Sequence, residues 1–401
     1  MLMQHDARSS APRYFAYRTA LVFSAPMIVN GIALPYFPVW LQSNGMNAAE
    51  IAAILAVPMV LRVIVAPVVS MISDRLGERA NVLIWSSILS FLTAIALFWS
   101  STFWPVAIIF GLQGAVYSPY IPVTESILLT GVRRWGFDYG LMRLWGSLAF
   151  IGSSIVAGAL IGQYGGGMVL PAMAIGFVLT IMAALIAPRT GRSQAAHAAI
   201  PPQRNILTRP YFLLLLIGAS LSQSSHAMLF ASSAIDWGKA GFTGTEIGIL
   251  WSAGVFAEVI VFLFARRLLR NFSNWALVFL GIGAAILRWL AYPLADGFAA
   301  FFALQCLHAF TFGTAHLAIQ NAIVENVGAS QEASAQGLYF FFNGSFLALA
   351  TYLSGSIYVA YGHWGFWSMA AISTLGMAFV LAGFLLQPQR PGSGGMTRES
   401  R

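Results

Sequence analysis

Charged residues are scarce in this chain of 401 residues. They make up 8% of the sequence, whereas hydrophobic residues make up 58%. A soluble domain carries roughly 25% charged residues, so this composition excludes a single soluble core and indicates that the solvent is lipid. Cysteine is scarcer still, because Cys306 is the only one. An internal disulfide is therefore excluded.

Sequence motifs of enzymes are missing as well. The chain has no P-loop, no cluster of metal ligands and no nucleophile placed beside a base. His308 and His316 are eight positions apart, and no third ligand lies near them in the sequence. We therefore expect no enzymatic activity, no bound metal and no cofactor.

Long apolar segments fill the chain instead. Each has about 20 residues or more, the length that crosses ~30 Å of hydrocarbon. The twelve predicted spans are 15–41, 48–72, 80–99, 103–130, 138–163, 167–187, 210–236, 244–265, 274–293, 298–325, 332–361 and 364–386. The sequence therefore predicts an all-α membrane protein with twelve transmembrane helices.

The basic residues predict how this protein lies in the membrane. Lys239 is the only lysine, and seventeen of the twenty arginines lie at the termini or after spans two, four, six and eight. Because basic residues collect on the cytoplasmic side, both termini are predicted to be cytoplasmic in a bacterial-type inner membrane. The net charge of +8 thus follows from topology, and no nucleic-acid partner is needed.

One short pattern occurs twice, which indicates two related halves. Residues 45–51 (GMNAAEI) reappear at 241–247 (GFTGTEI), 196 positions later, and Gly158 with Tyr164 matches Gly355 with Tyr361 at an offset of 197. In both copies, Asn47 with Glu50 and Thr243 with Glu246 have the spacing of a helix capping box. Two repeats in the same order are typical of a transporter built from parallel six-helix bundles. The predicted domains are 1–188 and 210–387, with a linker at 189–209 and a disordered tail at 388–401.

Two charged residues in the first half are the main substrate-site candidates. A charge at mid-bilayer costs at least ~2.5–3.5 kcal/mol. Glu125 and Arg143 each lie nine positions from Arg134, in the predicted turn, so both should sit roughly 13 Å from it on neighbouring helices. The 197-residue offset maps them near Ala322 and Phe340, so the second half lacks the pair. This asymmetry favours substrate binding over the alternative, an ion pair that only locks helices together.

The second half contributes a different set of charged and titratable residues. Glu258, Arg288 and His308 fall within spans eight, nine and ten. An acid, an arginine and a histidine inside a membrane are typical of a proton relay. His226 and His316 are interpreted as hydrogen-bonded core residues.

Aromatic residues in the first half supply candidate contacts for a ring. Tyr36, Tyr120, Trp145 and Phe150 lie in spans one, four and five. Most aromatic residues there should pack against lipid or helices, and Trp145 or Phe150 is a candidate stacking platform. Together with Glu125 and Arg143, these four form the predicted substrate site.

The loop between spans two and three resembles the signature loop of the major facilitator superfamily. It reads Ser73-Asp-Arg-Leu-Gly-Glu-Arg79. The resemblance implies the major facilitator fold. It also implies that Asp74, Arg75, Gly77 and Arg79 form a cytoplasmic gate that latches helix ends.

Within that superfamily the chain resembles the lactose-permease-like group. Segments 36–41 (YFPVWL) and 307–313 (LHAFTFG) are most similar to the branch of 3-phenylpropionate permeases and nucleoside proton symporters. Glu125 and Arg143 match the spacing of the pair that binds sugar in lactose permease. Thr311 stands where that permease has a proton-bearing glutamate, so the resemblance implies that coupling runs through Glu258, His308 or another acid.

The sequence therefore predicts a proton-coupled symporter that works by alternating access. Its partners would be lipid, a proton and a small organic solute, which is an aromatic acid such as 3-phenylpropionate, a sugar or a nucleoside. We expect a monomer. A multidrug proton antiporter is one rival, but the Gly-Pro signature usual for its fifth span is missing from 146–152. A membrane sensor is another, but the linker and tail are too short to form a signalling domain.

Overall fold

A computed structural model describes residues 10–76, 78–190, 206–268, 272–327 and 331–387, and no strand occurs in these ranges. The predicted tail at 388–401 and most of the linker at 189–209 lie outside them. The α-helices are α1 (Phe15–Ser43), α2 (Ala48–Leu76), α3 (Arg79–Ala96), α4 (Phe103–Tyr117), α5 (Tyr120–Trp135), α6 (Tyr139–Tyr164), α7 (Val169–Leu185), α8 (Pro210–Ser224), α9 (Ala227–Lys239), α10 (Gly244–Leu268), α11 (Asn274–Ala291), α12 (Gly297–Cys306), α13 (Ala315–Asn326), α14 (Glu332–Tyr361) and α15 (Trp367–Leu385).

Eleven stretches among the described residues are long and apolar enough to cross a membrane. The last of them, Ser334–Leu385, has 52 residues and contains α15 and all but the first two residues of α14. The predicted spans 103–130, 210–236 and 298–325 are each interrupted. Their breaks fall between α4 and α5, between α8 and α9, and at a π-helical turn, η5 (Ala309–Thr314), that joins α12 to α13. Pro119 lies at the first break and has no N–H to donate.

The repeated motif forms the predicted capping box in both halves. Asn47 Oδ1 accepts the N–H of residue 50 at 3.0 Å, and Glu50 Oε2 accepts the N–H of Asn47 at 2.9 Å. Thr243 and Glu246 repeat this exchange at the start of α10, at 3.3 and 2.8 Å. We call the end of the bundle that carries these motifs the capped end and the opposite end the arginine-rich end.

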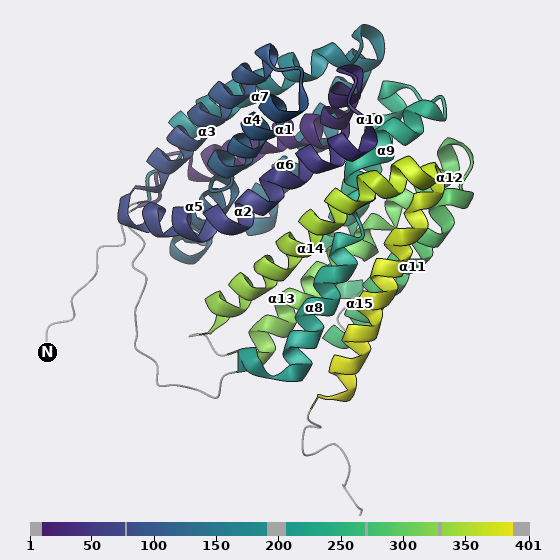
Figure 1. The fold of residues 1–401 in the computed structure, drawn as a ribbon. Coiled ribbons are helices and arrows are strands. Elements are labelled where there is room, and N and C mark those ends of the chain that lie inside the picture. The colour runs from purple at the N-terminus through teal and green to yellow at the C-terminus, as the bar shows by residue number, and fades with distance from the viewer. Residues whose placement is uncertain (1–9, 77, 191–205, 269–271, 328–330, 388–401) are drawn as a thin grey trace, which may run out of the picture.

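The helices of the two halves form two groups that pack together through few elements. Figure 1 shows α1–α7 on one side and the green and yellow helices α11–α15 on the other. The helix pairs α6–α10 and α2–α14 join the groups. Near the capped end the backbones almost touch, because a Cβ at Gly158 would lie 2.2 Å from the carbonyl oxygen of Gly244. Gly355 approaches Ala48 in the same way, at 2.5 Å. The two halves are therefore closed against each other at this end.

Tyr36 adds a polar contact to this closure. Its buried hydroxyl lies 3.0 Å from the carbonyl oxygens of Ser154, on α6, and Gly244, at the start of α10. The side chain therefore ties α1 to the other half of the molecule. Its predicted contact with substrate stays a prediction.

Replacing Tyr36 by phenylalanine should favour opening of the capped end. Loss of one net hydrogen bond costs about 1 kcal/mol, roughly a fivefold shift in population. The measurement is the rate at which a maleimide labels a cysteine introduced at Ala234, which lines the gap beside Tyr36 and is buried in the closed state, in a chain whose Cys306 is replaced by alanine. Tyr17→Phe, at a residue 75% exposed, is the matched control. Equal labelling rates in all three proteins would remove Tyr36 from the closure.

Candidate functional site

The turn between α5 and α6 places the first cluster. Gly136 follows α5 with φ +71°, a left-handed conformation that glycine adopts without strain. Asp138 then caps α6, because its Oδ1 accepts the N–H of Leu141 at 2.7 Å. Arg133 and Arg134 occupy the last turn of α5, where positive charge is favourable. The turn thus lies at 136–138, and the prediction that it centres on the two arginines was wrong.

Glu125 and Arg143 meet across this hairpin, as the sequence predicted. Arg143 Nη1 lies 3.7 Å from Glu125 Oε1, which is an ion pair but too long for a hydrogen bond. Tyr139, which the sequence analysis missed, stands between them. Arg143 donates to the Tyr139 hydroxyl at 2.7 Å, and the hydroxyl donates to Glu125 Oε2 at 3.1 Å. We call these three residues the hairpin cluster.

The side chains of the hairpin cluster are partly exposed, and the charge of Arg143 acts on residues of the other half. The side chains of Arg143 and Glu125 are 48% and 24% exposed. The charge of Arg143 interacts with Glu258 on α10 and with His316 on α13. The ring of Phe23, on α1, lies 5.8 Å from the guanidinium. A charged group flanked by an aromatic ring therefore faces the second half.

The predicted aromatic contacts lie in different surroundings. Trp145 is 58% exposed, and it stands two positions after Arg143, so the two side chains leave α6 on different sides. Phe150 and Tyr120 are buried in the packing of the first half. Tyr36 is part of the closure near the capped end. The structure therefore does not bring these four side chains together around Arg143.

A second polar cluster is buried in the other half, around Arg288. This arginine is fully buried on α11, and Trp289 lies under its guanidinium at 4.6 Å. It donates to His308 Nδ1 at 3.4 Å, to Thr311 Oγ1 at 3.3 Å, and to the side-chain oxygen of Gln305. Thr311 lies on the π-helical turn η5, His308 directly precedes it, and Gln305 lies in the last turn of α12. We call Arg288, Gln305, His308 and Thr311, together with Glu258, the buried cluster.

Arg288 determines which nitrogen of His308 carries the proton. A guanidinium can only donate hydrogen bonds, so Nδ1 of His308 accepts and the proton lies on Nε2. That nitrogen faces Glu258, whose Oε2 is 3.9 Å away. His308 is therefore a neutral link between a fixed positive charge and a carboxylate. The structure thus brings together the three predicted coupling residues, Glu258, Arg288 and His308.

His226 is joined to the buried cluster through Thr311. Its Nε2 lies 3.0 Å from Thr311 Oγ1, and its Nδ1 lies 3.0 Å from the carbonyl oxygen of Gln223. The interpretation of His226 as a hydrogen-bonded core residue is confirmed. His316 stacks on Phe312 at a centroid distance of 6.3 Å.

Most of the residues predicted to form the gate lie outside the described part of the chain. Asp74 and Arg75 lie on α2, but their side chains and Gly77 are outside the described residues. Arg79 is described, at the start of α3. It donates to the hydroxyl of Thr130, on α5, at 3.0 Å. The role of these four residues in a gate stays a prediction.

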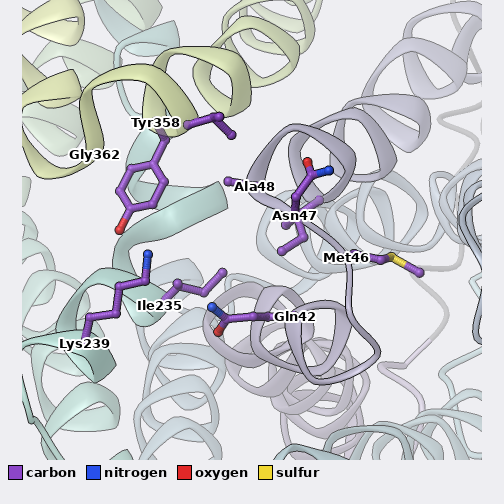
Figure 2. Close-up of a pocket in the computed structure, with 10 residues that line it drawn as sticks. Gln42, Met46, Asn47, Ala48, Ile235, Lys239, Tyr358 and Gly362 are labelled. Carbon is purple, nitrogen blue, oxygen red and sulfur yellow. The ribbon is translucent and has the colours of Figure 1, made fainter.

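A pocket of about 380 Å³ remains between the halves at the capped end. Figure 2 shows Gln42 and Asn47 on one side and Lys239 with Tyr358 on the other. The Tyr358 hydroxyl donates to Asp236 at 2.9 Å. Asp236 is a buried carboxylate that the sequence analysis missed, although it ends the predicted seventh span.

Comparison with known proteins gives the family. Residues 21–369 match the family described as MFS_1 like family. The chain belongs to that family. A curated relative, the probable 3-phenylpropionic acid transporter of Escherichia coli (strain K12), is 30% identical over 353 residues, which cover 86% of this chain and 91% of the relative. The resemblance to the major facilitator superfamily is thereby confirmed, and the protein is a transporter of that superfamily.

Solved structures agree on the fold. The nucleoside transporter NupG is 16% identical, with a TM-score of 0.71 and coverage of 93% of this chain and 99% of that one. A bacterial homologue of the human lysosomal transporter Spinster, inward-facing and unoccupied, is 13% identical, with a TM-score of 0.75 and coverage of 94% and 98%. At these identities the likeness concerns the fold alone.

Proposed function

We propose that this MFS_1-like transporter is a proton-coupled symporter that imports a small organic acid with an aromatic group. The observation that carries the proposal is the position of Glu258 between two arginines. On one side His308 links Glu258 to Arg288, and on the other side the charge of Arg143 reaches it from the first half. The name of the relative, a probable 3-phenylpropionic acid transporter, supports an aromatic acid.

Coupling would follow from competition for positive charge. While Glu258 is ionised, it offsets part of the charge of both arginines, and a substrate carboxylate gains little by approaching them. When Glu258 binds a proton, that offset is lost and the arginines attract an anion more strongly. A proton and a carboxylate would therefore bind together and leave together. The proton is assigned to Glu258 because His308 already accepts a bond from Arg288 and has no lone pair left on Nε2.

The transport cycle is proposed to be alternating access in a twelve-helix, two-repeat fold. Twelve crossings require that α14 and α15 each span the bilayer, and that each broken pair (α4–α5, α8–α9, α12–α13) crosses once. The capped end would face outside, and the arginine-rich end and both termini would face the cytoplasm. The tight packing at the capped end supports a state closed to the outside, and substrate would then leave toward the cytoplasm.

Purified protein in liposomes should show uptake of radiolabelled 3-phenylpropionate that an inward proton gradient accelerates. With one proton per carboxylate, each pH unit would support about tenfold accumulation. Protein-free liposomes, which admit the neutral acid passively, set the baseline, so initial rates are compared. An uptake rate equal to that baseline, with and without the gradient, would reject the proposed function.

A further inference from the structure

The hydroxyl of Tyr139 lies between the two charges of the hairpin cluster. Because Arg143 can only donate, the hydroxyl accepts from it at 2.7 Å and points its own hydrogen at Glu125, 3.1 Å away. The direct distance between Arg143 and Glu125 is 3.7 Å. One turn of α6 separates Tyr139 from Arg143, so the two side chains lie on the same face of the helix. The tyrosine therefore fills the place where a direct hydrogen bond between acid and arginine would form.

We infer that Tyr139 is a positioning residue that keeps Arg143 available for a substrate carboxylate. This inference rests on the proposed function. An acid substrate must draw Arg143 away from its partner in the empty site. Breaking a hydrogen bond between the arginine and a neutral hydroxyl takes less free energy than breaking one to a carboxylate, in which both partners are charged. Tyr139 can also keep donating to Glu125 after the arginine has moved, so that Glu125 is not left without a donor.

The same geometry explains how an acid can bind beside another acid. Glu125 would repel a carboxylate placed on Arg143, and a hydrogen bond from Tyr139 partly offsets its charge. A neutral ligand with a hydroxyl does not face this repulsion, because a hydroxyl can accept from Arg143 and donate to Glu125. Tyr139 thus favours acids over alcohols of the same shape.

The substrate arm of the test compares Tyr139→Phe with the wild type. Affinity for 3-phenylpropionate should fall about tenfold, while 3-phenylpropanol, tested as a competitor, should change less than threefold. In Tyr139→Phe the arginine can close onto Glu125, so adding Glu125→Gln should restore affinity to that of Glu125→Gln alone. Tyr164→Phe, at an exposed tyrosine on the same helix, is the matched control. Equal acid affinity in wild type and Tyr139→Phe would overturn the inference.

A second arm needs no substrate. The melting temperatures of wild type, Tyr139→Phe, Glu125→Gln and the double variant form a cycle in the empty protein. A bridging hydroxyl predicts that the two changes are not additive, by about 1–2 °C for a chain of this length. Additive shifts would overturn the inference. If the wild type does not bind 3-phenylpropionate, the proposed function fails, and this cycle still decides whether Tyr139 bridges the pair.

Discussion

Replacing Arg143 by alanine should lower the initial rate of uptake about 100-fold. The guanidinium is the only permanently charged group of the hairpin cluster, and it faces the other half. A charge-assisted bond that loses its donor costs about 3 kcal/mol, and each 1.4 kcal/mol is a factor of ten. The side chain is 48% exposed, so its removal leaves no large cavity and the protein should fold normally.

Replacing Arg143 by lysine tests whether uptake needs only the positive charge or also the planar shape of the guanidinium. Lysine keeps the positive charge but lacks the planar fork that binds a carboxylate with two parallel bonds. We expect its uptake to lie between those of alanine and wild type. Arg133→Ala, at an exposed arginine of the α5 C-terminal turn, controls for the loss of a basic residue. Uptake is measured in liposomes at matched protein content, with the melting temperature as a check on folding. Near wild-type uptake by Arg143→Ala would remove the substrate-binding role.

The larger features of this fold could be predicted because they follow from local patterns. Apolar length predicts membrane helices, and a cap residue three positions before a glutamate predicts where α2 and α10 begin. The sequence predicted that Glu125 approaches Arg143, but from a turn placed at Arg134. Moving the turn to 136–138 lengthens one arm of the hairpin and shortens the other, so the two residues are no longer equally far from it. The contact is made by two long side chains with the hydroxyl of Tyr139 between them.

What could not be predicted depends on contacts between distant or neutral residues. The sequence placed the turn at Arg133-Arg134, so Tyr139 fell at the start of a span, where no polar role was considered. Gln305 carries no charge and was not considered, and Thr311 was noted only because it replaces a glutamate. The bonds of both to Arg288 depend on how α11 packs and could not be predicted. The position of Glu258 beyond His308 depends on how α10 packs on η5, for which the chain has no local signal.

Replacing Glu258 by glutamine should abolish the acceleration of uptake by a proton gradient and leave exchange intact. Glutamine is neutral, like the protonated acid, so both arginines stay free to attract a carboxylate. Substrate can still bind and cross in either direction. The empty protein, however, can no longer restore a negative charge next to Arg288 and Arg143. We expect its return without substrate to be slowed, because two uncompensated positive charges must then cross in a medium of low dielectric constant.

Two assays distinguish exchange of substrate from uptake that is driven by the proton gradient. Counterflow, in which unlabelled acid inside exchanges for labelled acid outside, should remain within about threefold of wild type and should lose its dependence on pH. Initial uptake driven by an inward proton gradient should fall to the rate without a gradient. Glu325→Gln, at an exposed carboxylate of α13, is the control and should keep both activities.

The histidine provides an independent check on where the proton binds. His308→Gln keeps a neutral acceptor for Arg288 but removes the imidazole that faces Glu258. If Glu258 carries the proton, this variant should still respond to the gradient, with reduced affinity for the acid because Arg288 is held less well. If His308 carried it, His308→Gln would lose the response and Glu258→Gln would keep it. The pair of variants therefore assigns the proton to one of two side chains 3.9 Å apart, without reference to which acid is carried.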